Sequence, residues 1–147
     1  MPLATAIRTR CPAPLLTALR DVTGQHQDWT RTAQLRAHLP GPDLLTPEER
    51  AGDPAGYVSH VLHTEPDGSF SVCALVWRPG QITPIHDHVT WCVFGVIQGT
   101  EYEELYALRG DGRWLAEVGR NANSEGCLLY TSPSPRDTER SRMPSSA

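Results

Sequence analysis

The clearest structural signal in the chain lies at Tyr57–Trp77, YVSHVLHTEPDGSFSVCALVW. Two runs rich in β-branched and aromatic residues, Tyr57–His63 and Phe70–Trp77, flank a Pro-Asp-Gly turn, and this pattern predicts an antiparallel hairpin. Short strands at such regular spacing are typical of a β-sandwich or a β-barrel. Further strand-like runs follow at Trp91–Gln98, Glu101–Leu108 and Arg113–Val118.

The residues before this hairpin have helical signals instead. Pro14–Arg20 has a short amphipathic pattern, and Asp28 is placed to cap a helix over Trp29–Leu39. Thr46–Glu49, with a Pro directly after the Thr and two acidic residues behind it, predicts the start of another short helix. We expect residues 1–56 to form an N-terminal helical segment of the same domain as the strands.

The composition of the chain argues against several classes of function. The 147 residues suit one domain. A net charge of -4 without a basic stripe argues against nucleic acid or an anionic membrane surface as partner. No apolar run has the length of a membrane span, and no secretory signal is visible. The four Cys are scattered without C-x-x-C spacing, which argues against a disulfide scaffold or structural zinc. We therefore expect a cytoplasmic protein.

The last segment, residues 127–147, has a different character. Cys127–Asp137, CLLYTSPSPRD, looks like a translated transposase-type sequencing-library adapter, and its start is what TGT CTC TTA TAC ACA TCT encodes. Ser141–Ala147 resembles the distal end of that adapter in the same frame. We expect a non-native tail, with the natural reading ending near Gly126; the alternative is an ordinary Ser/Pro-rich disordered tail.

The chemistry-bearing segment is Gly80–Gly99, GQITPIHDHVTWCVFGVIQG. His86 and His88 are two residues apart, so on extended backbone their side chains point to the same face. Two imidazoles placed in this way can grip one divalent metal such as Fe, Ni, Cu or Zn. Asp87 would point the other way. Taken alone, the H-x-H pattern is equally consistent with a chance pair.

The wider pattern resembles the first metal motif of cupins, G-x5-H-x-H-x3-E-x6-G, which Gly80, His86, His88 and Gly99 match. Cys92 stands where that motif has Glu. Within cupins this departure is similar to the thiol dioxygenases, cysteine dioxygenase and its bacterial relatives, and the likeness runs from about Tyr57 to Tyr106. The resemblance implies a mostly β fold: an antiparallel cupin-type β-barrel, incomplete over residues 57–126, preceded by short N-terminal α-helices.

The same resemblance implies a mononuclear Fe(II) enzyme that oxidises a small thiol to its sulfinate with O2. His86 and His88 would be metal ligands, and the third His ligand is missing because no His follows His88. Cys92 would line the active site or mark a thioether position. His60 falls where many relatives have an Arg that binds the substrate carboxylate, so His60 is the candidate substrate-binding residue. We expect weak metal binding and little or no turnover from residues 1–147, which would be an inactive fragment of such an enzyme.

The sequence leaves open several alternatives for the substrate and for the type of protein. The substrate could be cysteine or another mercapto acid such as 3-mercaptopropionate, and the chain could be a non-redox metal-binding cupin of the sensor or isomerase type. An open half-barrel that is inactive and aggregates is a further possibility. His60 is equally consistent with a core residue, and His63 is expected to be exposed. A solvated strand face is expected for Glu101, Glu103 and Glu104.

Overall fold

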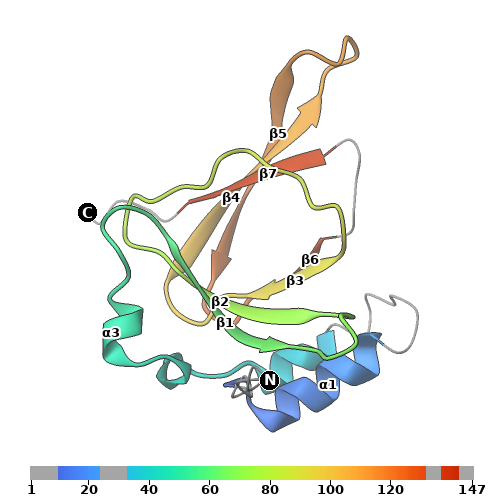
Figure 1. Ribbon diagram of the computed structural model, residues 1–147. Coiled ribbons are helices and arrows are strands. Elements are labelled where there is room, and N and C mark those ends of the chain that lie inside the picture. Colours follow the sequence, from blue (N-terminus) through green and yellow to red (C-terminus); the bar gives the residue numbers. More distant parts are fainter. Residues whose placement is uncertain (1–9, 24–32, 132–136, 143–147) are drawn as a thin grey trace, which may run out of the picture.

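The computed structural model describes residues 10–23, 33–131 and 137–142, and these form a mostly β structure with short helices at its N-terminal side (Figure 1). The helices are α1 (Ala13–Thr23), the 3-10 helices η1 (Ala33–His38) and η2 (Pro42–Leu44), and α3 (Pro47–Arg50). The strands are β1 (Val58–Thr64), β2 (Ser71–Val76), β3 (Cys92–Gly95), β4 (Thr100–Leu108), β5 (Leu115–Ser124), β6 (Leu128–Thr131) and β7 (Asp137–Arg142).

Two of the three predicted helices form as expected. The amphipathic helix α1 buries one apolar face, and α3 begins with a capping box in which Thr46 Oγ1 accepts from Glu49 N and Glu49 Oε2 accepts from Thr46 N. The helix predicted over Trp29–Leu39 is a 3-10 helix where it is described, at η1. Its predicted start and cap lie outside the described residues.

The predicted hairpin is confirmed: β1 and β2 pair antiparallel. Gly68 in the turn has a φ of +76°, a left-handed value that glycine adopts at little cost, and Asp67 Oδ1 accepts from Ser69 N at 2.8 Å. A register shift between Val61 and His63 interrupts the strict alternation of β1. Leu62 and His63 are consequently both buried.

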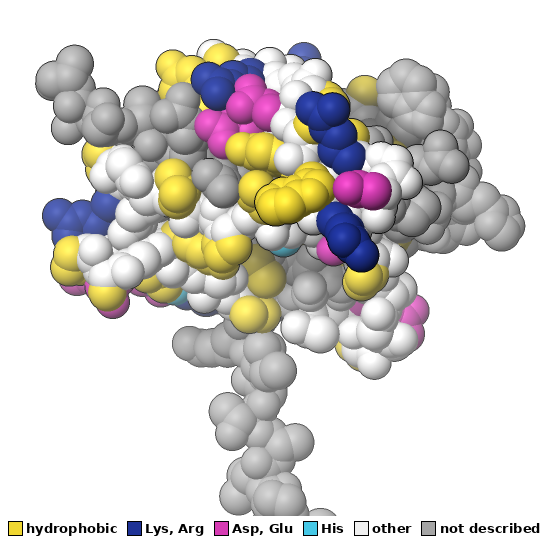
Figure 2. Space-filling model, turned by 90° about the horizontal axis from the view of Figure 1, so that it is seen from above, with side chains coloured by type: hydrophobic (Ala, Val, Ile, Leu, Met, Phe, Trp, Pro, Cys, Tyr) yellow, Lys and Arg dark blue, Asp and Glu magenta, His cyan; other side chains and the backbone are white. Residues whose placement is uncertain are grey.

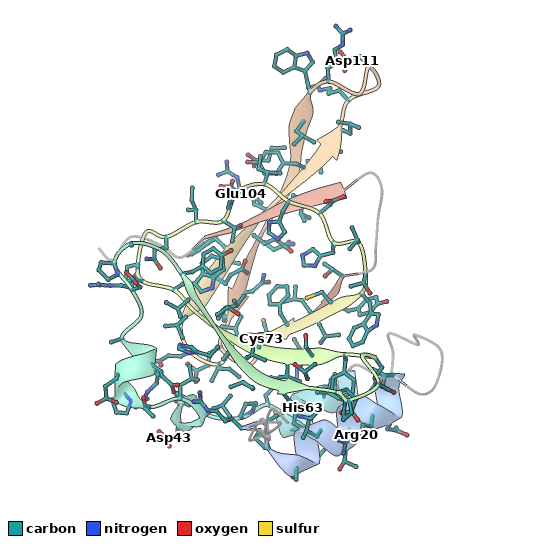
Figure 3. All side chains as sticks on the ribbon, viewed as in Figure 1. Arg20, Asp43, His63, Cys73, Glu104 and Asp111 are labelled. Atoms are coloured by element: carbon teal, nitrogen blue, oxygen red, sulfur yellow. The ribbon has the colours of Figure 1, made fainter. Side chains whose placement is uncertain are left out.

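His63 was therefore predicted wrongly as exposed. It is only 9% exposed, its Nε2 lies 2.7 Å from Glu65 Oε2, and its ring contacts Phe70. Figure 3 shows His63 close to Arg20, where α1 packs beside β1. The irregularity in β1 explains the error, because an alternating strand would have placed Leu62 and His63 on opposite faces.

The remaining strands form two further antiparallel sheets. β3 pairs with β6, and β4 is the central strand of a sheet in the order β5-β4-β7. Within the described residues the three sheets do not close into a barrel, and the prediction of a mostly β fold is confirmed. Two of the strands, β6 and β7, lie in the segment predicted to be a non-native tail. Its adapter origin stays a prediction, because strand pairing carries no information about where the codons came from.

The hydrophobic core lies between the helical segment and the strands. Its most buried members are Leu35 on η1 and Leu62 on β1, each 2% exposed, and four apolar side chains of α1 complete it from the helical side. Trp91 and Val93 pack against the same cluster from the β3 region. The helical segment thus contacts both the β1–β2 hairpin and the β3–β6 pair through one core.

The β4–β5 hairpin projects away from this core (Figure 1), and apolar side chains are exposed at its far end. Figure 2 looks onto this side of the molecule and shows hydrophobic side chains exposed beside arginines and acidic residues. Across the described residues, no helix has both the length and the apolar character that a membrane crossing requires. The exposed apolar side chains of the hairpin are Leu108, Trp114, Leu115 and Val118.

Candidate metal centre

The His86–His88 pair lies in the connection between β2 and β3. Gly80, with a φ of +84°, turns the chain after β2, and the segment with both histidines follows. The two imidazoles are half-buried and lie side by side, with ring centroids 5.2 Å apart and ring planes 49° apart. The expected juxtaposition of two rings is therefore present, at a separation from which both can reach one ion.

A backbone contact fixes the tautomer of His86. Its Nδ1 lies 2.9 Å from the carbonyl oxygen of Pro84. Because a carbonyl oxygen only accepts, this bond requires the proton on Nδ1, which puts the ring lone pair on Nε2. A metal-ligating histidine is commonly held in this way, with one ring nitrogen donating to the backbone and the other facing the metal. In such an arrangement, Nε2 is the nitrogen of His86 that would face a metal.

In the described part of the chain, His86 and His88 are the two candidate metal ligands at this position. Asp87, between the histidines, is exposed, as expected from strand alternation. Within residues 10–23, 33–131 and 137–142, no group of three His, Cys, Asp or Glu side chains is close enough to hold one metal ion.

Cys92 begins β3 and is half-buried. Its register partner on β6 is Thr131, whereas Val93 pairs with Tyr130. Directly paired residues share a face and successive residues alternate, so Cys92 and Tyr130 lie on opposite faces of the β3–β6 ladder. Val93 packs toward the core, so Cys92 occupies the other face. This register does not suit a thioether between Cys92 and Tyr130.

The structure places His60 in a different cluster from the His86–His88 pair. His60 is half-buried on the face of β1 that also carries Leu62, and its Nδ1 lies 4.0 Å from Glu49 Oε1. Its Nε2 is buried without a hydrogen-bond partner among the described residues. The substrate-binding role of His60 stays a prediction, and the charged group found 4.0 Å from its Nδ1 is a carboxylate.

Arg10 completes that cluster, and sequence reasoning missed it. Its Nη1 and Nη2 donate to the two carboxylate oxygens of Glu49 at 2.7 and 2.6 Å. These bonds, then the bond from Thr46 N, lower the pKa of Glu49 from its usual 4.5 to about 2. No sequence signal predicts this pair, since Arg10 and Glu49 lie far apart along the chain.

Two buried carboxylates on β4 are a second omission of the sequence analysis. Glu101 and Glu103 are 6% and 4% exposed, so the expectation of a solvated face is wrong for both. The reason is that β4 is a central strand rather than an edge strand. Glu101 Oε2 accepts from Asn123 Nδ2 and Glu103 Oε2 from Asn121 Nδ2, each at 2.7 Å. The matching Glu-x-Glu and Asn-x-Asn spacings were the available signal.

Glu104 lies on the opposite face of β4 from these two carboxylates. It is half-buried and accepts a hydrogen bond from the Tyr106 hydroxyl at 2.9 Å. The expectation of a solvated side chain is thus met only in part at Glu104. Figure 3 labels Glu104 on the middle of the hairpin, well away from Asp111 at its tip.

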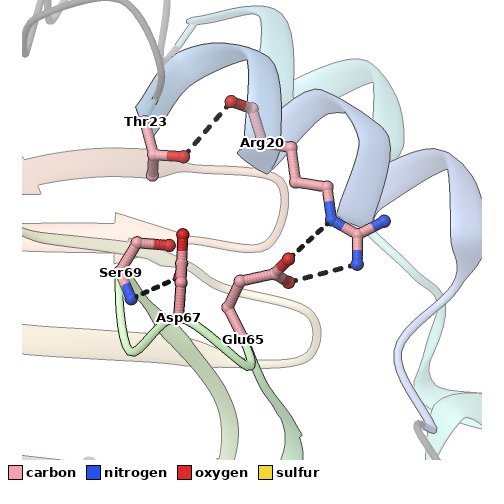
Figure 4. Close-up of a pocket in the computed structure, with 5 residues that line it drawn as sticks. All are labelled: Arg20, Thr23, Glu65, Asp67 and Ser69. Carbon is pink, nitrogen blue, oxygen red and sulfur yellow. Dashed lines mark hydrogen bonds and ion pairs between the residues drawn. The ribbon is translucent and has the colours of Figure 1, made fainter.

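A shallow polar pocket lies where α1 meets the β1–β2 turn (Figure 4). Arg20 Nε and Nη2 donate to the two oxygens of Glu65 at 3.0 and 3.2 Å. The bonds from Arg20, then the contact with His63, lower the pKa of Glu65. The Thr23 hydroxyl donates to the Leu19 carbonyl. The Arg20–Glu65 pair joins α1 to the β1–β2 hairpin, so we interpret the pocket as a structural contact between them.

No protein-family model matches the chain.

Proposed function

We propose that this chain represents a cupin-type, non-haem Fe(II) thiol dioxygenase, in which His86 and His88 hold the iron and a small thiol is oxidised to its sulfinate with O2. The observation that carries the proposal is the side-by-side placement of the two imidazoles, 5.2 Å apart, with His86 held by Pro84 as an Nε2 ligand. The cupin-type barrel is part of this proposal and is supported by the H-x-H segment between antiparallel strands.

The donor set suits a thiolate substrate. Two neutral imidazoles leave the charge of Fe(II) uncompensated, and Cys92 replaces the Glu whose carboxylate would cancel part of it. An anionic thiolate is therefore favoured as a further ligand. Bound iron supplies the means to bring the thiolate and O2 together. In the overall reaction both oxygen atoms of O2 are transferred to sulfur, so that a thiolate becomes a sulfinate.

The protein residues contribute orientation and charge. The Pro84 carbonyl keeps the Nδ1 proton of His86 in place, so the ring presents the same nitrogen throughout. Cysteine and 3-mercaptopropionate are both candidate substrates. His60 offers at most one positive charge and no bidentate fork, so it would hold a substrate carboxylate less firmly than an Arg. With two protein ligands, we expect weak iron binding and little or no turnover from residues 1–147.

Cobalt(II) provides a test that does not depend on turnover. The chain is titrated with Co(II) in the absence of O2, and the absorption spectrum is recorded before and after adding cysteine or 3-mercaptopropionate. We expect a thiolate-to-cobalt charge-transfer band that disappears in His86→Ala and His88→Ala. The matched control is His38→Ala, on the exposed side of η1.

The possible results of this titration distinguish the thiol dioxygenase from the non-redox metal-binding cupin. A band that persists in both His variants would refute the metal site. Cobalt or zinc binding that depends on His86 and His88 but does not respond to thiol would favour the non-redox metal-binding cupin. Thiol-dependent O2 uptake by the Fe(II)-loaded chain, compared between the two thiols, then identifies the preferred substrate.

A further inference from the structure

A second group of potential ligands lies on β4, apart from the histidines. Glu101 and Glu103 are two residues apart on one strand, so their side chains share a face and their Cα atoms are separated by about 6.6 Å. Their register partners Asn123 and Asn121 lie beside them on β5. Two carboxylates and two amides thus form a square of oxygen-bearing side chains on one face of the β4–β5 ladder.

One oxygen in this square is buried without a bond. Glu101 Oε2 accepts a hydrogen bond from Asn123 Nδ2. Glu101 Oε1, in contrast, is buried and has no hydrogen-bond partner among the described residues. Burying a carboxylate oxygen without a partner is costly, and the neighbouring carboxylate of Glu103 increases that cost. Such an atom in a folded protein calls for a bound ion or water that satisfies it.

We propose that Glu101 and Glu103 bind a hard divalent cation of the Mg2+ or Mn2+ class, with Glu101 Oε1 as a direct ligand. Every side-chain donor in the square is oxygen apart from the amide nitrogens, and oxygen donors suit these ions rather than the softer metals that imidazoles favour. Mg2+ sites are typically built from one or two carboxylates with water completing the shell. Among the described residues, these carboxylates and the His86–His88 pair do not form one group of three or more potential metal ligands.

The test uses a chain that carries His86→Ala and His88→Ala, which removes the other candidate metal site. Mn2+ binding is measured by EPR from the loss of the free-ion signal, and the melting temperature is compared in Mg2+ and in EDTA. We expect Mn2+ to bind, Mg2+ to raise the melting temperature, and Glu101→Gln to weaken Mn2+ binding by at least about tenfold. The control is Glu125→Gln, an exposed acidic residue just after β5, which should bind Mn2+ unchanged.

A second variant keeps the test decisive if Glu101→Gln does not fold. Asn123→Asp adds a third carboxylate to the square, and we expect it to tighten Mn2+ binding and to enlarge the stabilisation by Mg2+. Equal melting temperatures in Mg2+ and EDTA would overturn the proposal. It would also fail if Mn2+ bound equally well to the parent and to Glu101→Gln.

Discussion

Replacing Gly95 by alanine should destabilise the protein through a single contact with Leu39. Gly95 ends β3, and a Cβ added there would lie 2.6 Å from Leu39 Cδ2 and 3.2 Å from Leu39 Cδ1. Carbon atoms prefer separations of about 3.5–4.0 Å, so the closest contact is short by about 0.9 Å. The backbone of Gly95 is not in the left-handed region, so alanine adds no conformational strain there.

The expected magnitude follows from two opposing terms. Overpacking destabilises the folded state by about 1–3 kcal/mol. In the opposite direction, alanine on compatible backbone stabilises the protein by about 0.4–1 kcal/mol, because it lowers the conformational entropy of the unfolded chain. The difference between these terms is about 0–2.6 kcal/mol, and we expect Gly95→Ala to lower the free energy of unfolding by an amount in that range, measured by urea denaturation with an unchanged m-value.

A double-mutant cycle tests the assigned cause. In the Leu39→Ala background the clash is absent, so Gly95→Ala should become neutral or slightly stabilising. Gly119→Ala on β5 is the matched control, since its added Cβ would meet Leu105 at an ordinary 3.6 Å. An equal loss from Gly95→Ala in both backgrounds would refute the reasoning, and with it the contact between the helical segment and β3.

Three further predictions concern the core, acid stability and thiol exposure. Leu62→Ala should lower the free energy of unfolding by about 2–5 kcal/mol in urea, whereas Val61→Ala, at a 58% exposed position, should change it by less than about 0.5 kcal/mol. Because the folded-state pKa of Glu49 is about 2 and its usual value 4.5, its ionised form stabilises the fold above pH 4.5, and this contribution is lost as the pH falls toward 2. Glu49→Gln should therefore lower the melting temperature more at pH 6 than at pH 2, and equal shifts would contradict the Arg-paired geometry. Cys73 is exposed, whereas Cys11 is buried and its burial raises the pKa of its thiol. Alkylation, followed by mass spectrometry, should therefore be faster at Cys73 in the folded protein. In urea the two thiols should react at equal rates.

The features predicted correctly from the sequence are local ones. Thr46 and Glu49 are three residues apart, so the capping box could be read directly from the chain. The β1–β2 hairpin depends on a turn of a few residues, and the adjacent placement of His86 and His88 depends only on extended backbone between them. In each case the partners lie within one turn or one short segment.

The features that were missed depend on contacts between distant segments. Glu101 and Glu103 are buried because β4 receives strands on both sides, and that strand order cannot be derived from β4 itself. His60 lies beside Glu49, which belongs to α3, and no pattern within β1 indicates that neighbour. The burial of His63 is a separate case, because it follows from a local irregularity in β1. The alternation of residues along one strand does not indicate which strands flank it, although the matching Glu-x-Glu and Asn-x-Asn spacings are compatible with the observed β4–β5 pairing.

The pairings of β6 with β3 and of β7 with β4 have a consequence for how copies of the chain could interact. Ladder hydrogen bonds join main-chain atoms, so they place little restriction on the side chains of the strand that is added. Any extended peptide can in principle compete for the same two edges. A neighbouring copy that supplied its own residues 128–131 or 137–142 would produce a domain-swapped dimer, in which each edge is covered by the other molecule.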